Sequence, residues 1–185
     1  MAYIARRSVK QPRRRRAPGR HEPPFTPEEW KAQSAIREAG ILWTIRQRFW
    51  LFGTCSYTDG TRITDEQAHK DAAHFFNKLD RALLKRRDYD EKRRLPRLVF
   101  LEKGITGENT HIHFLIKGTK LNQYKHIKWT AECIWPTLTN AHDIVMKDAT
   151  TSNVDRAIYC WKEFYIRESD TLIEGCCHLS RPLYT

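Results

Sequence analysis

The segment from Asp65 to about Arg87 constrains the fold most strongly, because its apolar residues repeat with the period of an α-helix. One face of this helix collects Ala68, Ala72, Phe75, Phe76, Leu79, Ala82 and Leu83, and the other face is charged. Such a helix must bury its apolar face against another element. Residues 95–102 and 110–117 follow as apolar runs joined by a short connection that contains glycine, which predicts an antiparallel hairpin.

The other segments alternate between strand and helix. Residues 49–57 form an aromatic run that predicts a buried strand, 121–135 predict a helix and 141–146 a strand. A helix is expected from Thr26-Pro27, with Gly40 able to end it. A last helix is expected from Ser152 to about Arg167, with a core face of Val154, Ile158, Trp161 and Tyr165. The order predicts an α+β fold, a split βαββαβ antiparallel sheet covered by helices, of the ferredoxin-like and RNA-recognition type.

Positive charge is concentrated at the N-terminus. Residues 1–24 carry eight Lys and Arg residues against Glu22, a net +7 of the +11 of the whole chain. With four prolines in the same stretch, this segment cannot bury a core, and we expect a disordered arm followed by one domain over 25–185. Arg13, Arg14, Arg15 and Arg16 would bind polyanions through their phosphates. A solubilising or targeting tail is the alternative.

Several classes of protein are disfavoured by the composition. No apolar run approaches the roughly 18 residues of a membrane span, and no secretory signal follows the basic N-terminus. Five cysteines, an odd number without a C-x-x-C pair, indicate a reducing compartment, and we expect a cytoplasmic protein. Cys176-Cys177-His178 does not match the spacing of structural zinc ligands.

His111-Ile112-His113 is the first pattern that suggests chemistry. Alternate residues of a strand share a face, so both imidazoles point to one side while Ile112 points into the core. Across the expected hairpin, Glu102 falls opposite His111. Two imidazoles and a carboxylate would make an open site for a divalent metal. Alternatively, both histidines lie on a solvated sheet face and Glu102 is an ordinary ion-pair partner.

Tyr159 and Lys162 form the second pattern. At a spacing of three residues on a helix they lie together, beside the apolar face and not within it. A tyrosine is a poor nucleophile unless a nearby cation or metal favours its phenolate. In the alternative interpretation, Tyr159 is a boundary aromatic residue and Lys162 is a solvated charge.

Taken together, these patterns resemble the HUH endonucleases, and more narrowly the Rep initiators of rolling-circle replication in plasmids and small single-stranded DNA viruses. The family's three ordered motifs are matched by Phe52-Gly53-Thr54-Cys55-Ser56-Tyr57, by Glu102 with His111 and His113, and by Tyr159 with Lys162. The resemblance covers residues 48–167 and includes the βαββαβ order. The single tyrosine resembles the one-tyrosine members, because Tyr165 does not have the four-residue step of two-tyrosine initiators.

The resemblance implies an activity, a cofactor and partners. Glu102, His111 and His113 would hold Mg²⁺ or Mn²⁺, and Tyr159 would attack single-stranded origin DNA to leave a 5′-phosphotyrosine and a free 3′-hydroxyl. Lys162 would steady the phosphate or phenolate, and a later 3′-hydroxyl would rejoin the strand. Arg48, Arg97 and Lys117 would contact the DNA. No helicase phosphate loop is present, so a host helicase and polymerase in a prokaryotic cytoplasm are the expected partners.

Two alternatives stay open at this point. A single-tyrosine HUH transposase or relaxase would share the metal pair. A non-enzymatic basic nucleic-acid-binding module would share the fold but needs exposed aromatics on the middle strands, where this chain has His111 and His113.

Overall fold

The computed structural model describes residues 27–104, 109–117, 121–164 and 171–179. Its strands are β1 (Leu51–Tyr57), β2 (Arg97–Glu102), β3 (His111–Ile116) and β4 (Ala141–Asp148). Its α-helices are α1 (Pro27–Arg46), α2 (Asp65–Leu83), α3 (Arg86–Asp90), α4 (Leu121–Ile134) and α5 (Asn153–Cys160). The predicted order of strand, helix, strand, strand, helix, strand is confirmed by these elements.

The four strands form one antiparallel sheet in the order β2-β3-β1-β4. Because β3 lies between β1 and β2 and is antiparallel to both, β1 and β2 run in the same direction. Helix α2 connects these two strands across the intervening one, which is the split βαβ arrangement. The predicted hairpin is confirmed as well, with Glu102 paired to His111 in the ladder.

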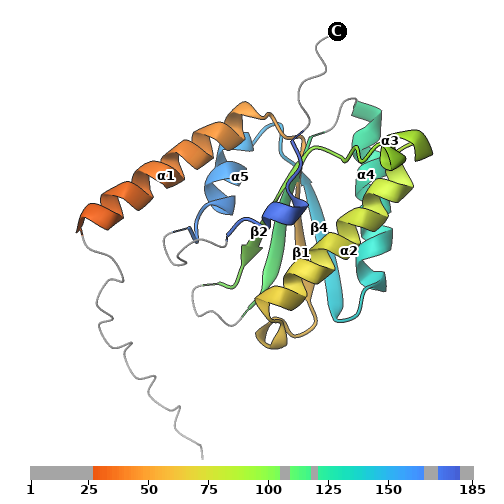
Figure 1. The fold of residues 1–185 in the computed structure, drawn as a ribbon, viewed down its shortest axis with the longest axis horizontal. Helices are drawn as coiled ribbons and strands as arrows, with labels where there is room; N and C mark the ends of the chain where they lie inside the picture. Colours follow the sequence, from red (N-terminus) through yellow and green to blue (C-terminus); the bar gives the residue numbers. More distant parts are fainter. Residues whose placement is uncertain (1–26, 105–108, 118–120, 165–170, 180–185) are drawn as a thin grey trace, which may run out of the picture.

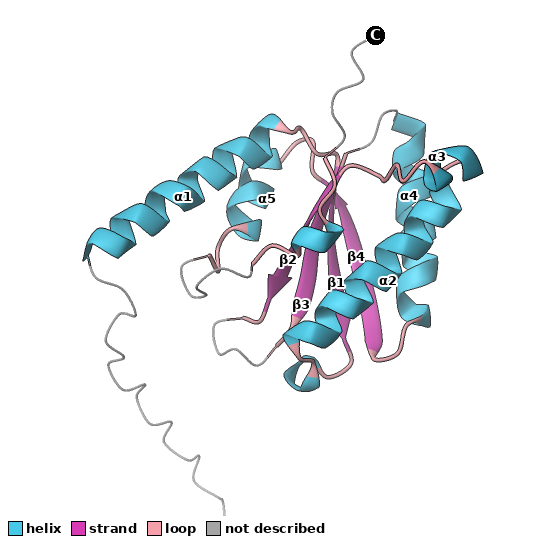
Figure 2. Ribbon diagram, viewed as in Figure 1, coloured by secondary structure: helices cyan, strands magenta, loops and turns pink. Residues whose placement is uncertain are grey.

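Helices cover the sheet on two sides (Figures 1 and 2). On one side α2 and α4 pack on the larger core, to which α2 contributes Phe75 and Phe76 and β3 contributes Phe114. On the other side α1 and α5 pack over a smaller core that contains Phe100 and Trp161. Gly53 of β1 is required here, since a Cβ on it would lie 2.1 Å from the Phe114 ring. Strands β1, β2 and β3 therefore have their alternate residues divided between two apolar layers, whereas β4 buries only the side that faces the larger core.

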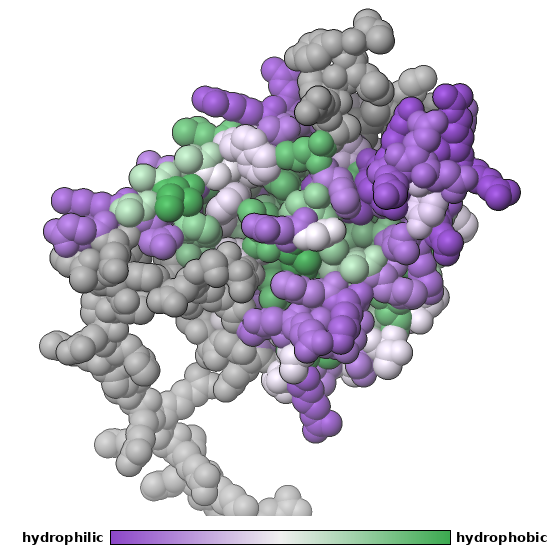
Figure 3. All heavy atoms as spheres, in the orientation of Figure 1, coloured by the Kyte–Doolittle hydropathy of each residue, from purple (hydrophilic) through white to green (hydrophobic). Residues whose placement is uncertain are grey.

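Helix α1 continues past Gly40, where the sequence predicted its end. Gly40 faces the Trp161 ring, and a Cβ there would lie 2.6 Å from it, so the glycine allows two helices to approach closely. The indole nitrogen of Trp161 donates to Thr44 at 3.0 Å, which secures the contact. The opposite face of α1 is exposed, and hydrophobic residues gather over this helix in Figure 3.

Helix α5 is shorter than predicted, ending at Cys160 instead of near Arg167. Its expected core face was also partly wrong. Val154 and Ile158 are 51% and 43% exposed, whereas Ala157, Cys160 and Trp161 are buried. Tyr165, expected to pack in the core, lies outside the described residues.

The segment 171–178 lies along the free edge of β2, although its sequence has no periodicity that predicts this. Bridges join Phe100 to Leu172 and Arg97 to His178. Cys176 is buried in the larger core, and the Cys177 sulfur lies 3.3 Å from the Val99 amide. Backbone pairing at this edge satisfies groups that an edge strand would leave open. Among the helices of the described residues, none combines the length and apolar character that crossing a membrane requires.

Candidate active site

The hairpin β2–β3 brings the predicted acid and both histidines to one face of the sheet. Glu102 is the ladder partner of His111, and His113 is two residues further along the same face. The two imidazole rings lie 6.3 Å apart between centroids and are nearly parallel. Ile112 and Phe114 point into the larger core on the other face. The shared face predicted from strand alternation is confirmed.

His113 is held through both of its ring nitrogens. Its Nε2 is hydrogen-bonded to Oε2 of Glu102, and its Nδ1 lies 2.9 Å from the Thr54 hydroxyl on β1. Desolvation lowers the pKa of His113 and outweighs the opposing effect of Glu102. A hydroxyl both donates and accepts. Thr54 can therefore satisfy Nδ1 in either tautomer of His113.

His111 is oriented by the backbone. Its Nδ1 lies 2.9 Å from the Asn109 carbonyl oxygen, which can only accept, so Nδ1 carries the proton. In a neutral ring, the Nε2 atom of His111 then keeps its lone pair. Metal-binding histidines in proteins are oriented in this way, through a hydrogen bond at the nitrogen that does not bind the metal.

Glu102 is an ionised and largely enclosed carboxylate, with 12% of its side chain exposed. Burial alone would raise its pKa, but the hydrogen bonds and charges of His113 and Lys162 outweigh burial and lower the pKa to about 2. Lys162 is the lysine paired with Glu102, and its Nζ lies 2.6 Å from Oε1. Partial burial opposes the charge of Lys162, yet its bonds to Glu102 and Tyr159 raise its pKa.

Helix α5 presents Tyr159 to this cluster. The Tyr159 ring meets the His113 ring edge-on at 5.1 Å between centroids and the Phe52 ring at 5.9 Å. The Lys162 ammonium lies 3.7 Å from the centre of the Tyr159 ring. The side chain is 38% exposed and so is open to a substrate. The acid, the two histidines, the tyrosine and the lysine predicted from sequence are thus brought together.

The local sequence explains why Tyr159 and Lys162 both face the cluster. Cys160 and Trp161 between them point into the smaller core. Lys162 is not on the helix as predicted but in the turn that follows, where its amide bonds to the Tyr159 carbonyl at 3.2 Å. The turn preserves the proximity that helical spacing led us to expect.

Three further residues support the cluster and were not assigned a role from sequence. Thr54 and Phe52 contact His113 from β1, with the Phe52 ring stacked on the imidazole at 5.6 Å. Buried Glu163 accepts a hydrogen bond from the Lys103 amide at 3.0 Å, which ties the residue after Lys162 to the residue after Glu102. Strand alternation places Phe52 and Thr54 on one face, but no sequence signal identifies the partner of Glu163.

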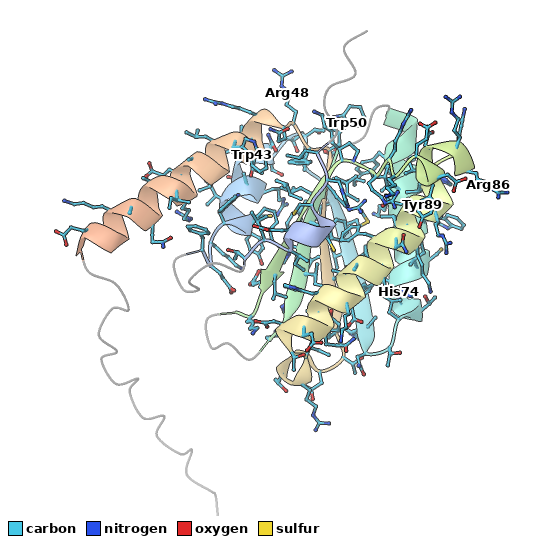
Figure 4. All side chains as sticks on the ribbon, viewed as in Figure 1. Trp43, Arg48, Trp50, His74, Arg86 and Tyr89 are labelled. Atoms are coloured by element: carbon cyan, nitrogen blue, oxygen red, sulfur yellow. The ribbon has the colours of Figure 1, made fainter. Side chains whose placement is uncertain are left out.

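The basic residues predicted to bind DNA lie away from the cluster. Arg97, five residues before Glu102 on β2, is about 16 Å from it along the strand. The ladder also puts Arg48 and Lys117 near that far end of the sheet. Arg48 is exposed and points away from the fold (Figure 4). Arg13, Arg14, Arg15 and Arg16 lie outside the described residues.

Arg97 requires a correction, because it is buried and cannot contact DNA. Only 3% of its side chain is exposed, and its guanidinium lies 2.8 Å from fully buried Asp80. It also donates to the Cys176 carbonyl at 3.0 Å. Arg156, which the sequence did not single out, is the arginine closer to the cluster, 5.0 Å from the centre of the Phe52 ring.

The carboxylate and imidazole donor atoms of the cluster are of the kind that a divalent metal prefers, although they are not arranged around a common ion position. Within the described ranges, no three or more His, Cys, Asp and Glu side chains are arranged to hold an ion, and Glu102 and His113 are bonded to each other directly. The carboxylate is ionised, and Nε2 is the ring atom left to bind on His111. Glu102, His111 and His113 are the residues that would hold such an ion.

Comparison of the chain with protein-family models, with curated proteins and with solved structures gave no match.

Proposed function

We propose that this protein is a HUH-type endonuclease that nicks single-stranded DNA and becomes joined to it through Tyr159, as a rolling-circle replication initiator does. The observation that carries the proposal is the contact of a phenol with a carboxylate–imidazole pair. Tyr159 lies against His113, and Lys162 touches both Tyr159 and Glu102. Strongly perturbed acids and bases that meet at a partly open surface are typical of active sites.

In the proposed reaction the Tyr159 oxygen attacks phosphorus and the bond to the 3′ oxygen breaks. The phenol proton of Tyr159 is lost to solvent, and the products are a 5′-phosphotyrosine and a 3′-hydroxyl, whose oxygen takes up a proton from solvent. Lys162 has a raised pKa and stays protonated, so it acts as a cation that stabilises the phenolate or the phosphate and not as the base. Attack by a later 3′-hydroxyl on the phosphotyrosine reverses the step and rejoins the strand.

A divalent ion, Mg²⁺ or Mn²⁺, would be held by Glu102, His111 and His113 and would withdraw charge from the scissile phosphate. Thr54 and the Asn109 carbonyl would keep the two imidazoles oriented. With Nε2 of His113 given to the ion, the Thr54 hydroxyl would accept a hydrogen bond from the protonated Nδ1. The support for this assignment is the donor chemistry and the fixed ring orientation.

The exposed side of β4 is the surface that would carry the DNA strand to Tyr159. Val145 pairs with Thr54 and Lys147 with Phe52, so both share the face of the cluster. Val145 is 45% exposed, and Lys147 is exposed. With Arg156 beside Phe52, this surface combines cations for phosphates and apolar area for bases.

The test is covalent capture of DNA. The full chain is incubated with fluorescent single-stranded oligonucleotides of mixed sequence and Mn²⁺, and denaturing gels are examined for a protein–DNA adduct. We expect an adduct that a chelator prevents, that Tyr159→Phe abolishes, and that the matched control Tyr165→Phe retains. An adduct that persists in Tyr159→Phe contradicts the assignment, and binding without any adduct would indicate a non-enzymatic nucleic-acid-binding domain.

A further inference from the structure

Helix α1 has one face that is covered by the domain and an opposite face that is exposed. The inner face packs on α5 through Gly40 and Thr44. The outer face carries a stripe at helical spacing that we call the α1 stripe, made of Ala32, Ala35, Ile36, Ala39 and Leu42. All five are exposed, with Ile36 at 52% and Leu42 at 55%. An apolar stripe along one face of a helix normally packs against another element.

Helix α5 also carries exposed apolar residues, since Val154 and Ile158 are about half exposed. Tyr159 faces another direction, toward His113. Isolated exposed apolar residues are ordinary, but a set of five along one face of a helix, as in the α1 stripe, marks a contact surface.

The charges at the two ends of the α1 stripe indicate which partner fits it. Glu28 and Arg46 are both exposed and lie five helical turns apart, so they fall on the same line as the stripe, about 27 Å from each other. A second α1 that runs antiparallel would place Arg46 beside Glu28 at one end and Glu28 beside Arg46 at the other. The same register sets Ala32 against Leu42 and Ala35 against Ala39, so each of these pairs contains at least one small residue and the helices can pack closely.

We infer that α1 is a dimerisation helix whose stripe pairs with the same stripe of a second copy of this chain. A two-fold axis that crosses the outer face at the level of residue 37, midway along the stripe, makes the surface self-complementary, as a closed dimer requires. The domain of each copy lies on the inner face of its own α1, so the two domains sit on opposite sides of the helix pair (Figure 1). This inference does not depend on nuclease activity.

The test is the mass of the full chain in solution, measured by sedimentation velocity over a range of concentrations. We expect a concentration-dependent dimer that Leu42→Glu converts to a monomer with an unchanged circular dichroism spectrum. Glu28→Lys and Arg46→Glu should each weaken the dimer by about tenfold, because each reverses two symmetric ion pairs. The double variant should recover the wild-type dissociation constant.

The control is Glu66→Lys, a charge reversal at an exposed position of α2, which should leave the dimer unchanged. Three results overturn the inference. They are a monomeric wild-type chain at every concentration, a dimer that Leu42→Glu leaves intact, and a double charge swap that is no better than either single change. A fourth result would also overturn it: a monomeric wild-type chain in which residues 1–24 are protected from amide hydrogen exchange and lose this protection in Leu42→Glu. That result would show that residues 1–24 of the same chain cover the α1 stripe.

Discussion

Removal of the Asp80 carboxylate should be among the most destabilising single changes in this chain. Asp80 is fully buried and accepts hydrogen bonds from Arg97 at 2.8 Å and from the Leu95 amide at 3.1 Å. Asp80→Ala leaves the Arg97 guanidinium buried without its counter-charge. Breaking a buried pair in this way costs about 3–5 kcal/mol. For a domain of this size that loss corresponds to a fall of about 6–20 °C in Tm.

The assay is urea denaturation followed by circular dichroism, together with a thermal scan. Glu91→Ala is the matched control, because it removes an exposed partner of Arg87 and should leave the stability nearly unchanged. Replacing both buried partners, Asp80→Leu with Arg97→Met, should recover most of the loss. A cost for Asp80→Ala as small as that of Glu91→Ala would refute the reasoning. A DNA affinity whose salt dependence falls when Arg97 is replaced would show that Arg97 contacts phosphate after all.

Three further predictions concern the cluster and its support. Thr54→Val removes the hydroxyl that orients His113 and should weaken Mn²⁺ binding by about 10- to 100-fold in titration calorimetry; an unchanged affinity contradicts the orienting role. Glu102 has a folded pKa of about 2 against an ordinary 4.5, so the stability it contributes is present above pH 4.5 and is lost as the pH falls toward 2. When the free energy of unfolding is measured against pH, Glu102→Gln should flatten the curve between these two pH values. A variant curve that runs parallel to that of the wild type would contradict this prediction. Gly40→Leu forces a side chain into the Trp161 ring and should lower stability by about 1–3 kcal/mol, whereas Ala39→Leu, on the outer face, should be tolerated by the monomer.

The elements of the sheet and the face of the histidines could be predicted from sequence because they depend on local periodicity. The alternation of His111, Ile112 and His113 fixes which side chains share a side, whatever surrounds the strand. The short hairpin connection likewise limits which residue can lie opposite His111, and Glu102 is its partner. Local rules of this kind do not need knowledge of the tertiary packing.

Contacts between distant segments could not be predicted in the same way. Arg97 looked like a surface cation, but the segment 171–178 covers its strand and Asp80 neutralises it. Gly40 looked like a helix end, yet it is the point where Trp161 packs against α1. The close contacts of Lys162 with Glu102 depend on a turn that replaces the expected continuation of α5. Each of these outcomes depends on a partner more than fifteen residues away in the chain, about which local patterns carry no information.

The most direct measurement of the central claim is to locate the DNA attachment by mass spectrometry. Trypsin cleaves after Arg156, Lys162 and Arg167, so Tyr159 and Tyr165 fall on separate peptides, residues 157–162 and 163–167. After nuclease trimming of the adduct, we predict that the first peptide carries a nucleotide joined through its 5′-phosphate to Tyr159. A modification on the second peptide, or an adduct with neither peptide modified, would contradict the account.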